Sequence, residues 1–552
     1  MVFTSITEKK WVFVLILCAV SGFFIFYQLG ARNFCDIRKE SRRAEIAREM
    51  VDGGDWLIPH LNNQVILTKP PLYYWSVALA SGKTGVTELT SRIPSAISGI
   101  GTILFTFLIG SLFFNPSTGF FAGLILLTTN LFYLQARYAE LDTMLTFFTT
   151  GAIYYFIRGY QKPEKLTSSS ILFFLFLGLG TMTKGPFAFT VPLIPITLWL
   201  LRNKELHLLK SKKFLISIIV FFAVLLPWCL AISFKRPQFV SVVLVETLAK
   251  YATGYAHARP FFYYFEKFWK LFFPWSLLLP FSCLLILTNP LKEKRKELVF
   301  LLLWFLANFL FFSISKSKRG FYLLPLTPCV ALLVAATWNP LVNTVKNYLP
   351  SKRRLITSFS FILGIILIAI PFLIKKPFIP TIPDTHFPKG DSFALFAGLI
   401  LVSIVAINLL TAHKKRNGIY LSALILILLG FQSLYPHYSI PFINRTESAK
   451  DFYLKALHLI KPDEEIGYYG KYENYALIFY TARYTTFLGD EEKVRSFMKT
   501  PERRFIITSS KRYPYFENEG WKKVLTSPYS DFSSKYGYGM FTNHNNLTQI
   551  LQ

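Results

Sequence analysis

Cysteine is scarce in this sequence. The five cysteines form no CxxC pair, and only Cys35 lies outside the apolar segments that hold Cys18, Cys229, Cys283 and Cys329. A disulfide framework and a thiolate zinc site both need cysteines at close and regular spacing. Neither is therefore expected to hold this fold together.

Acidic residues are also few: the sequence has 31 Asp and Glu against 60 Lys and Arg, which gives a net charge of +29. The basic residues are spread between apolar segments, so nucleic acid is not an expected partner. Basic loops next to apolar spans are typical of a membrane protein that meets anionic lipid or phosphate groups.

Hydrophobic residues make up 53% of the chain and aromatic residues 17%, a balance that soluble domains do not carry. The expected class is therefore a mainly α-helical, polytopic membrane protein. The first apolar run, 11–29, lacks a small-residue cleavage motif, so we expect a retained helix and not a signal peptide.

About thirteen segments are apolar enough to cross a bilayer as helices, which takes roughly twenty residues each. The pair on either side of Lys184-Gly185-Pro186 is short for this purpose. The expected spans are 11–29, 91–114, 118–135, 141–158, 170–183, 186–201, 214–234, 269–288, 298–315, 321–338, 355–374, 392–412 and 417–435.

Short basic connections place the N-terminus in the cytoplasm, as the positive-inside rule requires. The loops 30–90 and 235–268 then face outward, and an odd number of spans puts the C-terminal region outside as well. We expect a transmembrane domain over 1–438 and a small soluble α/β domain over 439–552. The second domain is indicated by a helical run near 447–460 and by strand-like runs at 465–469, 484–488 and 504–508.

Residues 37–51 carry Ile37, Ala44, Ala47 and Val51 at helical spacing, with charged residues between them. This pattern predicts an amphipathic helix that lies on the outer face of the bilayer. A plain interfacial anchor has the same pattern, so the helix alone does not indicate a site.

Lys69 stands before Pro70-Pro71 and the aromatic residues Tyr73 and Tyr74, at the end of the charged stretch that follows the first apolar segment. Proline fixes φ and biases the preceding residue toward extended geometry, so the lysine is held in place. A cation beside aromatic rings at a membrane surface suits the phosphate of a lipid-like ligand in a cavity. A lysine that snorkels at a helix start is the alternative.

Two acids, Glu140 and Asp142, stand at the outer entrance of a span, where a carboxylate that faced lipid would be costly. An acid that faces a cavity at this place is a candidate base or a hydrogen-bond acceptor for a substrate hydroxyl. A salt bridge to Arg137 is the alternative.

Further cations stand at the outer ends of spans. They are Lys184, where Gly and Pro break a helix, Arg259 in the second outer loop, and Arg319 shortly before Tyr322. The hydroxyl of Tyr322 is able to donate a hydrogen bond into the same region. His257 is a possible metal ligand, although a lone histidine is more often an ordinary hydrogen-bonding residue.

Polar chemistry is thus concentrated at the outer ends of spans, with little at mid-membrane. Secondary transporters instead place their binding groups near the midplane, on broken helices in repeated halves. The pattern therefore favours an enzyme that acts at the outer membrane surface on a lipid-linked substrate.

Several motifs, in their order and spacing, carry a resemblance to a known family. They are 39–50, 54–59, 69–75, 92–96, 137–142, 183–186, 322–325 and 479–483. The chain resembles integral-membrane glycosyltransferases of the GT-C fold that use polyprenyl-phosphate sugars. The bacterial lipid A aminoarabinose and galacturonosyl transferases are most alike, and protein O-mannosyltransferases are similar more distantly.

The resemblance implies transfer of one sugar from a polyprenyl (undecaprenyl) phosphate to lipid A or a related glycolipid, at the periplasmic face of a bacterial inner membrane. In this family, the lysine that matches Lys69 contacts the donor phosphate and the one that matches Lys184 adds positive charge there. The residue that matches Tyr322 lies in the same cavity, and the acid that matches Asp142 lies at the reaction centre. No nucleotide-binding motif occurs, so a nucleotide sugar is not expected as the direct donor.

The sequence departs from the family at two positions. The family's Asp-Glu pair in the first outer loop, whose Asp is a proposed base, is here Lys39-Glu40, and an acid that helps to bind metal is replaced by Thr68. Glu40 and Asp142 are left to orient the acceptor or act as base, and Asp36 is an alternative substitute for the missing acid. A divalent metal therefore stays open, with no confident site.

The lysine at position 39 bears on the substrates. A phosphate acceptor is already anionic and needs no base, and a uronic-acid donor would be favoured by an added cation. Two other functions remain open, namely a protein O-mannosyltransferase-like enzyme with a hydroxyl acceptor and a flippase for lipid-linked saccharides. Phosphate binding by Lys69, Lys184, Arg259 and Arg319 would neutralise the leaving group in the enzyme, where charge develops in the transition state.

Overall fold

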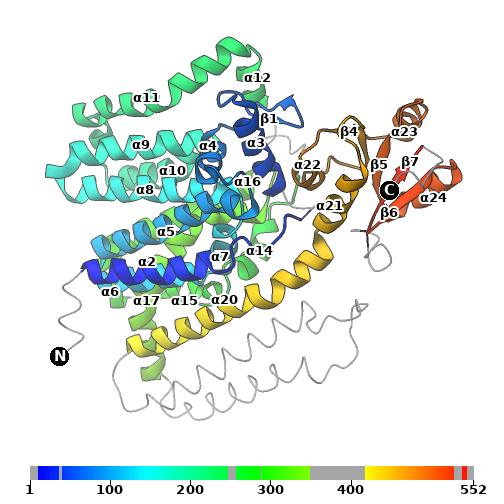
Figure 1. Ribbon diagram of the computed structural model, residues 1–552. Coiled ribbons are helices and arrows are strands. Elements are labelled where there is room, and N and C mark those ends of the chain that lie inside the picture. The colour runs from blue at the N-terminus through cyan, green and yellow to red at the C-terminus, as the bar shows by residue number, and fades with distance from the viewer. Residues whose placement is uncertain are drawn as a thin grey trace, which may run out of the picture. The chain divides into compact units, whose positions relative to one another are not determined.

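A computed structural model describes most of the chain (Figure 1). The described residues are 10–35, 40–245, 257–287, 289–348, 417–527 and 537–543. They fall into two compact units, each assembled from three stretches of sequence. Unit 1 is Met1–Tyr27, Leu67–Tyr73 and Ser95–Leu434, and unit 2 is Gln28–Ile66, Tyr74–Pro94 and Tyr435–Gln552.

Unit 1 is helical. Its helices are α2 (Lys10–Phe26), most of α5 (Glu88–Phe113), α6 (Pro116–Leu127), α7 (Asn130–Ala136), α8 (Leu141–Gln161), α9 (Leu166–Lys184), α10 (Phe187–Arg202), α11 (Lys212–Lys235), α12 (Phe239–Leu244), α14 (Tyr263–Leu271), α15 (Leu279–Leu287), α16 (Arg295–Ile314), α17 (Thr327–Tyr348) and the first part of α20 (Asn417–Glu447). Short 3-10 segments join several of them, among them η6 (Gly320–Leu326) before α17.

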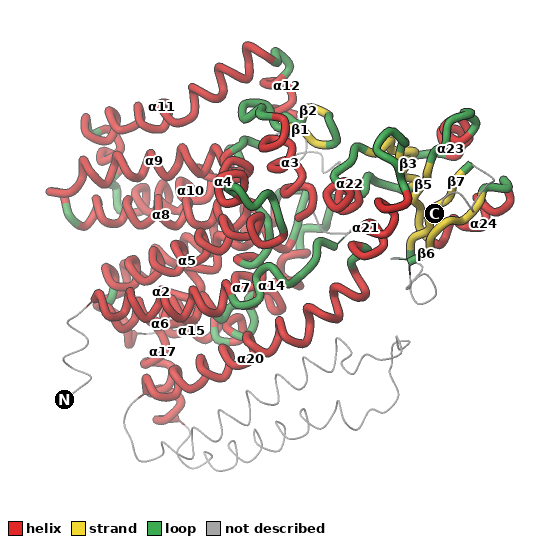
Figure 2. The backbone as a smooth tube through the Cα atoms, viewed as in Figure 1, coloured by secondary structure: helices red, strands yellow, loops and turns green. Residues whose placement is uncertain are grey.

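Helices α8, α9, α10 and α11 run side by side in unit 1 (Figure 2). Close approach between α8 and α9 depends on a small residue, because a Cβ on Gly151 would lie 2.3 Å from the ring of Phe176. Small residues at helix contacts are the usual means by which membrane helices pack closely, since lipid provides no hydrophobic drive between them.

Five helices among the described residues are long and apolar enough to cross a membrane, or up to seven if each bent pair is one span. The count of about thirteen is therefore not confirmed. The expected span 118–135 is two helices, α6 and α7, bent by 71°, and 269–288 falls in a second pair bent by 117°. The expected spans 355–374 and 392–412 lie outside the described residues.

Unit 2 contains a five-stranded sheet of order β4-β3-β5-β7-β6, in which β3, β4 and β5 are parallel and β7 is antiparallel to β5 and β6. The strands are β3 (Ile466–Tyr469), β4 (Thr485–Leu488), β5 (Phe505–Ser509), β6 (Lys522–Thr526) and β7 (Tyr538–Thr542). The remaining elements are α3 (Glu40–Gly53), the hairpin β1 (His60–Leu61) and β2 (Gln64–Val65), most of α4 (Leu72–Ser81), α21 (Lys450–Leu459), α22 (Tyr475–Thr481), α23 (Glu491–Met498) and α24 (Tyr513–Asn518).

Side chains of the sheet alternate between two hydrophobic cores. Phe505 and Ile507 of β5 pack with residues of α21 and α22, whereas Ile506 packs with residues of α23 and α24. The expected soluble α/β region is thus a sheet with helices on both faces.

Unit 2 also includes residues 28–66 and 74–94, which the sequence predicts to be part of a transmembrane domain that ends at 438. The reason is long-range packing, since Phe34 and Ala44 belong to the core around α21 and α22. The amide of Phe34 donates to the hydroxyl of Tyr480 (2.7 Å), and Asn62 exchanges two hydrogen bonds with the backbone of Thr485 (2.8 and 2.9 Å). Sequence patterns do not reveal such pairings across 400 residues.

Candidate functional site

The break between α9 and α10 places a lysine at a helix end. Gly185 ends α9 with φ +83° and ψ −151°, its amide donates to Thr181 O (2.8 Å), and α10 begins after Pro186. Lys184 is the last residue of α9, where the helix dipole favours a cation. The sequence thus fixes both the end of the helix and the charge that stands there.

Lys184 is paired with Asp142. The ammonium donates to one carboxylate oxygen of Asp142, and the two side chains are 11% and 4% exposed. Asp142 lies in the first turn of α8, where the dipole favours an anion. Two residues that the sequence singled out separately therefore form one buried ion pair, and the carboxylate's partner is Lys184.

Two aromatic residues of η6 cover this pair. The Lys184 ammonium lies 4.8 Å from the ring centroid of Tyr322 and 5.6 Å from that of Phe321, distances at which a cation is attracted to the ring face. A small, mainly apolar pocket opens beside the pair, and its lining is Asp142, Leu145, Lys184, Phe187, Phe312, Tyr322 and Pro325. A charged group at the rim of an apolar pocket suits an amphiphilic ligand.

A second cationic group is built where two loops meet. Ala258 and Ser317 pair as an antiparallel bridge, and the amide of Arg259 donates to Lys316 O (3.1 Å). The Arg259 guanidinium lies 6.0 Å from the ring of Tyr263.

Arg319 and His257 are brought together by the same two loops. Their side chains form a hydrogen bond, and His257 has a left-handed φ of +65°. The Arg319 guanidinium lies 5.6 Å from the ring of Phe321, the ring that also faces Lys184. The expected phosphate ligands Lys184 and Arg319 thus share one aromatic neighbour.

Lys69 precedes α4, and its ammonium donates to the backbone oxygen of Thr68 (2.9 Å). Tyr73 and Tyr74, expected to line the cavity, are buried with 0% and 1% exposure. The Tyr73 hydroxyl is hydrogen-bonded to Ser95 (3.0 Å).

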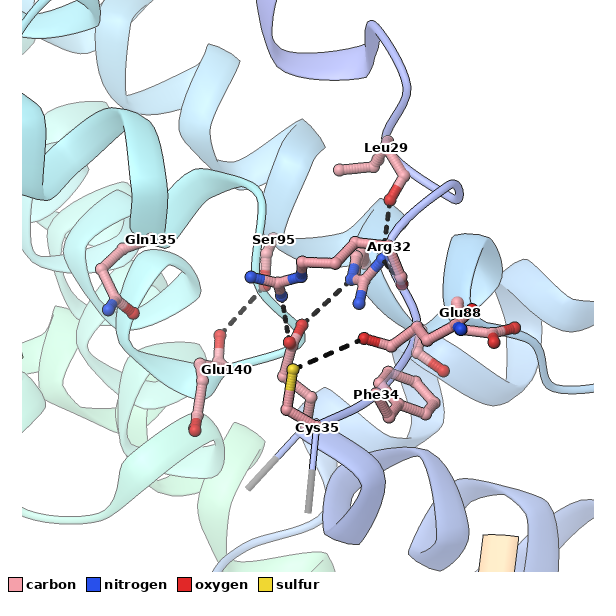
Figure 3. A network of polar contacts seen from close by, with 12 residues as sticks. Leu29, Arg32, Phe34, Cys35, Glu88, Ser95, Gln135 and Glu140 are labelled. Atoms are coloured by element: carbon pink, nitrogen blue, oxygen red, sulfur yellow. Dashed lines mark hydrogen bonds and ion pairs between the residues drawn. The ribbon is translucent and has the colours of Figure 1, made fainter. Parts of the chain in front are cut away.

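The backbone carbonyl of Glu140 accepts a hydrogen bond from the Ser95 hydroxyl (3.0 Å; Figure 3). Ser95 therefore links Tyr73 to the turn that precedes Asp142. The motifs 92–96 and 137–142, which the sequence shows only as separate stretches, are in contact here.

Glu40 lies in unit 2 and has structural partners. Its carboxylate is 2% exposed and receives the Arg92 guanidinium at 3.0 Å and that of Arg32. Arg92 also donates to the backbone oxygens of Leu29 (2.8 Å) and Arg32 (2.7 Å), in the segment seen in Figure 3. Glu40 therefore holds together the segment before α3, the start of α3 and the start of α5.

A second buried acid of α3 is Glu45. It forms a two-pronged ion pair with Arg48, at 2.6 and 2.9 Å. Burial raises the pKa of Glu45 to about 7, although the Arg48 guanidinium opposes the shift. The helix expected on the membrane surface thus exists, but it buries Ala44, Ala47 and two acids within unit 2.

The described residues do not fit a metal centre. Within them, no three His, Cys, Asp or Glu side chains come together in a way that could hold an ion. The candidate ligand His257 places its Nε2 against the Arg319 guanidinium, which disfavours a dication. Two further candidates, Asp36 and Lys39, lie outside the described residues.

Sequence reasoning had not assigned roles to four residues that shape these sites. Ser95 and Arg92 stand only within matching motifs, Lys318 stands only within the basic cluster that also holds Arg319, and Arg32 is not singled out. A polar residue next to a span is the signal that they share, but the contacts that give it meaning come from distant parts of the chain.

The chain was compared with known proteins. Residues 11–243 match the family model described as dolichyl-phosphate-mannose-protein mannosyltransferase. The undecaprenyl phosphate-alpha-4-amino-4-deoxy-L-arabinose arabinosyl transferase of Pectobacterium atrosepticum is 31% identical over 396 residues, which are 70% of this chain and 68% of that protein. The protein of the same name from Serratia proteamaculans is 30% identical, over 67% of each chain.

This chain belongs to the same family of glycosyltransferases as these arabinosyl transferases. It is an enzyme and a multi-pass membrane protein. The relatives are covered over about two thirds of their length.

The fold of the glycosyltransferase is GT-C. The crystal structure of ArnT from Cupriavidus metallidurans, bound to undecaprenyl phosphate, matches it with a TM-score of 0.76 at 19% identity, over 97% of this chain and 98% of that chain. The resemblance that the motifs indicated is thereby confirmed for family and fold.

Proposed function

We propose that this glycosyltransferase moves one sugar from undecaprenyl phosphate, or another polyprenyl phosphate, to lipid A or a related envelope glycolipid. The observation that carries the proposal is the buried Lys184–Asp142 pair beneath Tyr322, at the rim of an apolar pocket. A lipid phosphate has the anionic and apolar parts that this site matches. The relatives' names, which include undecaprenyl phosphate, support the choice of donor.

The reaction breaks the bond between the sugar's anomeric carbon and a phosphate oxygen and forms a bond from that carbon to an acceptor oxygen, while the leaving phosphate keeps the bonding electron pair and gains negative charge. Cations already in place at that oxygen stabilise the transition state more than the ground state. Lys184 and Arg319, which face one ring of Phe321, are the central ligands in the proposal. Lys69 is assigned to the same phosphate from the family resemblance, and Arg259 from its place in the second cationic group, next to the segment that carries Arg319.

Asp142 is assigned to the acceptor. In the free enzyme its carboxylate is bound to Lys184, which makes it a poor base. When a donor phosphate arrives, it competes for the ammonium and releases the carboxylate. Asp142 then accepts a proton from a hydroxyl acceptor or orients a phosphate acceptor, which needs no base.

Lys39 bears on the choice of sugar. Because the family has an acid at this position, the cation favours a donor sugar with a carboxylate or an acceptor that is a phosphate. A Lys39→Asp variant should then use a uronic-acid donor less well than the wild type. Equal turnover of that donor by the two proteins would remove this part of the proposal.

The proposed location is a bacterial inner membrane, with the site and the C-terminal region on the periplasmic face. Lipid-linked sugars are donors on that face in the resemblance described above. The short basic connections between apolar segments support this orientation from the sequence.

Mass spectrometry of lipid A tests the proposal, in matched cells that have or lack the protein. A mass increase equal to one sugar, lost in a Lys184→Met/Asp142→Asn variant, is the expected result. Purified enzyme should also release sugar from radiolabelled undecaprenyl phosphate-sugar. Modified glycoprotein with unchanged lipid A would favour a protein O-mannosyltransferase-like function, and movement of the intact donor across vesicles without cleavage would favour a flippase.

A further inference from the structure

Lys318 is a buried lysine that the reaction as proposed does not use. The residue is 3% exposed, and its ammonium donates to the backbone oxygens of Arg259 (3.1 Å) and Ser315. Its own amide donates to the backbone oxygen of His257 (3.1 Å). Lys318 therefore bonds the 257–260 segment through both its side chain and its main chain.

Burial of this ammonium is costly, because a charge taken from water needs compensation. The contacts that the structure describes for the ammonium are with neutral carbonyls and include no carboxylate. Burial also lowers the pKa of the Lys318 side chain. An apolar residue would fill this position at less cost, so the two directed hydrogen bonds are the feature that requires lysine.

The segments joined by Lys318 carry the cations of the second group. Arg259 lies beside Tyr263 in one segment, and Arg319 in the other segment is hydrogen-bonded to His257. The backbone oxygen of Arg319 is in turn fixed by the hydroxyl of Tyr264 (3.0 Å). Each cation depends on the register of two loops that are distant in sequence.

We propose that Lys318 is a positioning residue, which locks the 257–260 segment onto the 315–320 segment so that Arg259 and Arg319 face the donor phosphate together. The assignment rests on the proposed function, because it takes a lipid phosphate as the donor. Lys318 itself does not contact the substrate. Its ammonium donates hydrogen bonds to backbone oxygens of the two loops, and the phosphate binds to the guanidinium groups of Arg259 and Arg319.

The first test compares Lys318→Met with Lys316→Met, in the full-length enzyme with undecaprenyl phosphate-sugar as donor. Both changes remove one charge from the same loop, but the Lys316 side chain is exposed. Loss of hydrogen bonds to a charged group should lower kcat/KM of Lys318→Met by roughly ten-fold or more, with Lys316→Met near wild type. Equal activity of the two variants would overturn the proposal.

A covalent tether separates positioning from direct binding. In the Lys318→Met background, Ala258→Cys and Ser317→Cys place two thiols on the bridged pair of residues, and oxidation joins the segments. If Lys318 acts by position, the oxidised protein regains donor kcat/KM and the reduced protein does not. A tether that forms, as mass spectrometry of the peptides reports, without recovery of activity would assign Lys318 to the substrate and overturn the proposal.

Amide hydrogen exchange gives a result that does not depend on turnover. The amides of Arg259 and Lys318 are bonded across the two loops, and they should exchange faster in Lys318→Met than in Lys316→Met. If no polyprenyl-phosphate donor is used by the wild type, the proposed function fails while this difference persists. Unchanged exchange would instead remove the positioning role. Lys318→Arg, which keeps the charge and the donors, should retain both protection and activity if the methionine variant does not fold.

Discussion

At the scale of single residues, the Lys184–Asp142 pair serves two purposes that conflict. The charges stand at favourable ends of two helices and neutralise each other in a buried place. The proposed reaction needs Lys184 to bind phosphate and Asp142 to face the acceptor. Stability and activity should therefore respond differently when the pair is altered.

Lys184→Met leaves the carboxylate of Asp142 buried without its partner, which should cost about 3–5 kcal/mol of stability. Adding Asp142→Asn removes the stranded charge, so the double variant should regain most of this stability. Activity should stay low, roughly 100- to 1000-fold below wild type, because the cation at the leaving phosphate is absent. Thermal unfolding in detergent and kcat/KM for the donor are the two measurements.

The outcome that contradicts this account is recovery of activity together with stability in the double variant. The pair would then be structural, and the phosphate would be bound elsewhere. Tyr322→Phe is a milder control, because it retains the ring beside Lys184 and removes only the hydroxyl.

Glu40, in contrast to Lys184 and Asp142, should affect stability and not the chemical step. As a base it would need access to a substrate proton, but the carboxylate is occupied by Arg32 and Arg92. Glu40→Gln leaves these guanidinium groups poorly compensated, so the melting temperature should fall by an amount that corresponds to about 3–5 kcal/mol. At temperatures where the variant remains folded, kcat/KM should be within about three-fold of wild type, because the chemistry is assigned to other groups.

Glu164→Gln is the matched control, since it is the same change at an exposed position. A loss of activity in Glu40→Gln with an unchanged melting temperature would return Glu40 to the role of base. The two measurements together thus decide between the sequence-based role and the structural role.

Candidate site residues stand out in the sequence more readily than their partners do. Asp142 and Lys184 are conspicuous in the sequence because a charge beside a membrane span is expensive. They stand 42 positions apart in the chain, and nothing in the sequence indicates that they meet. Arg92 is less conspicuous still, because it stands at the start of an apolar run like many cations that face water, although its contacts with Glu40 and Leu29 are buried.

At the scale of elements, the end of α9 depends on one glycine. The φ and ψ of Gly185, +83° and −151°, lie in a region that other residues hardly adopt. A Cβ built at this position meets no atom within 4 Å, so any penalty comes from the backbone alone.

Gly185→Ala should therefore lower stability by about 1–3 kcal/mol and shift Lys184 away from Asp142. Gly22→Ala, in α2, is the control, since a Cβ there also meets nothing within 4 Å while the backbone is helical. That change should leave stability equal or up to about 1 kcal/mol higher. Thermal unfolding of both variants, with donor KM for the first, provides the test; equal behaviour of the two alanines would show that the backbone at 185 is not strained.

The elements also show where sequence patterns lose information. The helix near 447–460 and the strands near 465–469, 484–488 and 504–508 were predicted because their apolar patterns are long enough to read, and they are α21, β3, β4 and β5. The strands β6 and β7 were missed. The first has no clear alternation in burial, and the second is buried along its whole length.

The bend between α6 and α7 has no proline or glycine to signal it. The hydroxyls of Thr128 and Thr129 donate to the carbonyls of Leu124 and Ile125 at the end of α6, with distances of 2.8 Å. Such local hydrogen bonds end a helix without a change in hydropathy. The unbroken run of apolar residues therefore predicts one continuous span over 118–135, although the chain bends within it.

At the scale of the whole molecule, composition is sufficient to predict the class of protein, but it does not predict how the chain divides into two units. The balance of apolar and basic residues required a membrane protein, and the family comparison confirmed it. Units 1 and 2 are each made from three separate stretches, because in unit 2 hydrogen bonds such as Phe34–Tyr480 join the segment 28–66 to the C-terminal region. The basic charge of the connections between spans still predicts which side of the membrane each one faces, which the packing of the helices does not show.

The positive-inside rule places the C-terminal α/β region and the basic 202–213 connection on opposite sides of the membrane. Tyr472, 73% exposed in unit 2, and Lys210, also exposed, are suitable positions for single cysteines. A membrane-impermeant maleimide should label Tyr472→Cys in intact spheroplasts and Lys210→Cys only after permeabilisation. The unsubstituted protein supplies the background from its own cysteines, of which Cys35 and Cys329 are buried. Labelling of Lys210→Cys in intact spheroplasts with protection of Tyr472→Cys would reverse the orientation and place the C-terminal region in the cytoplasm.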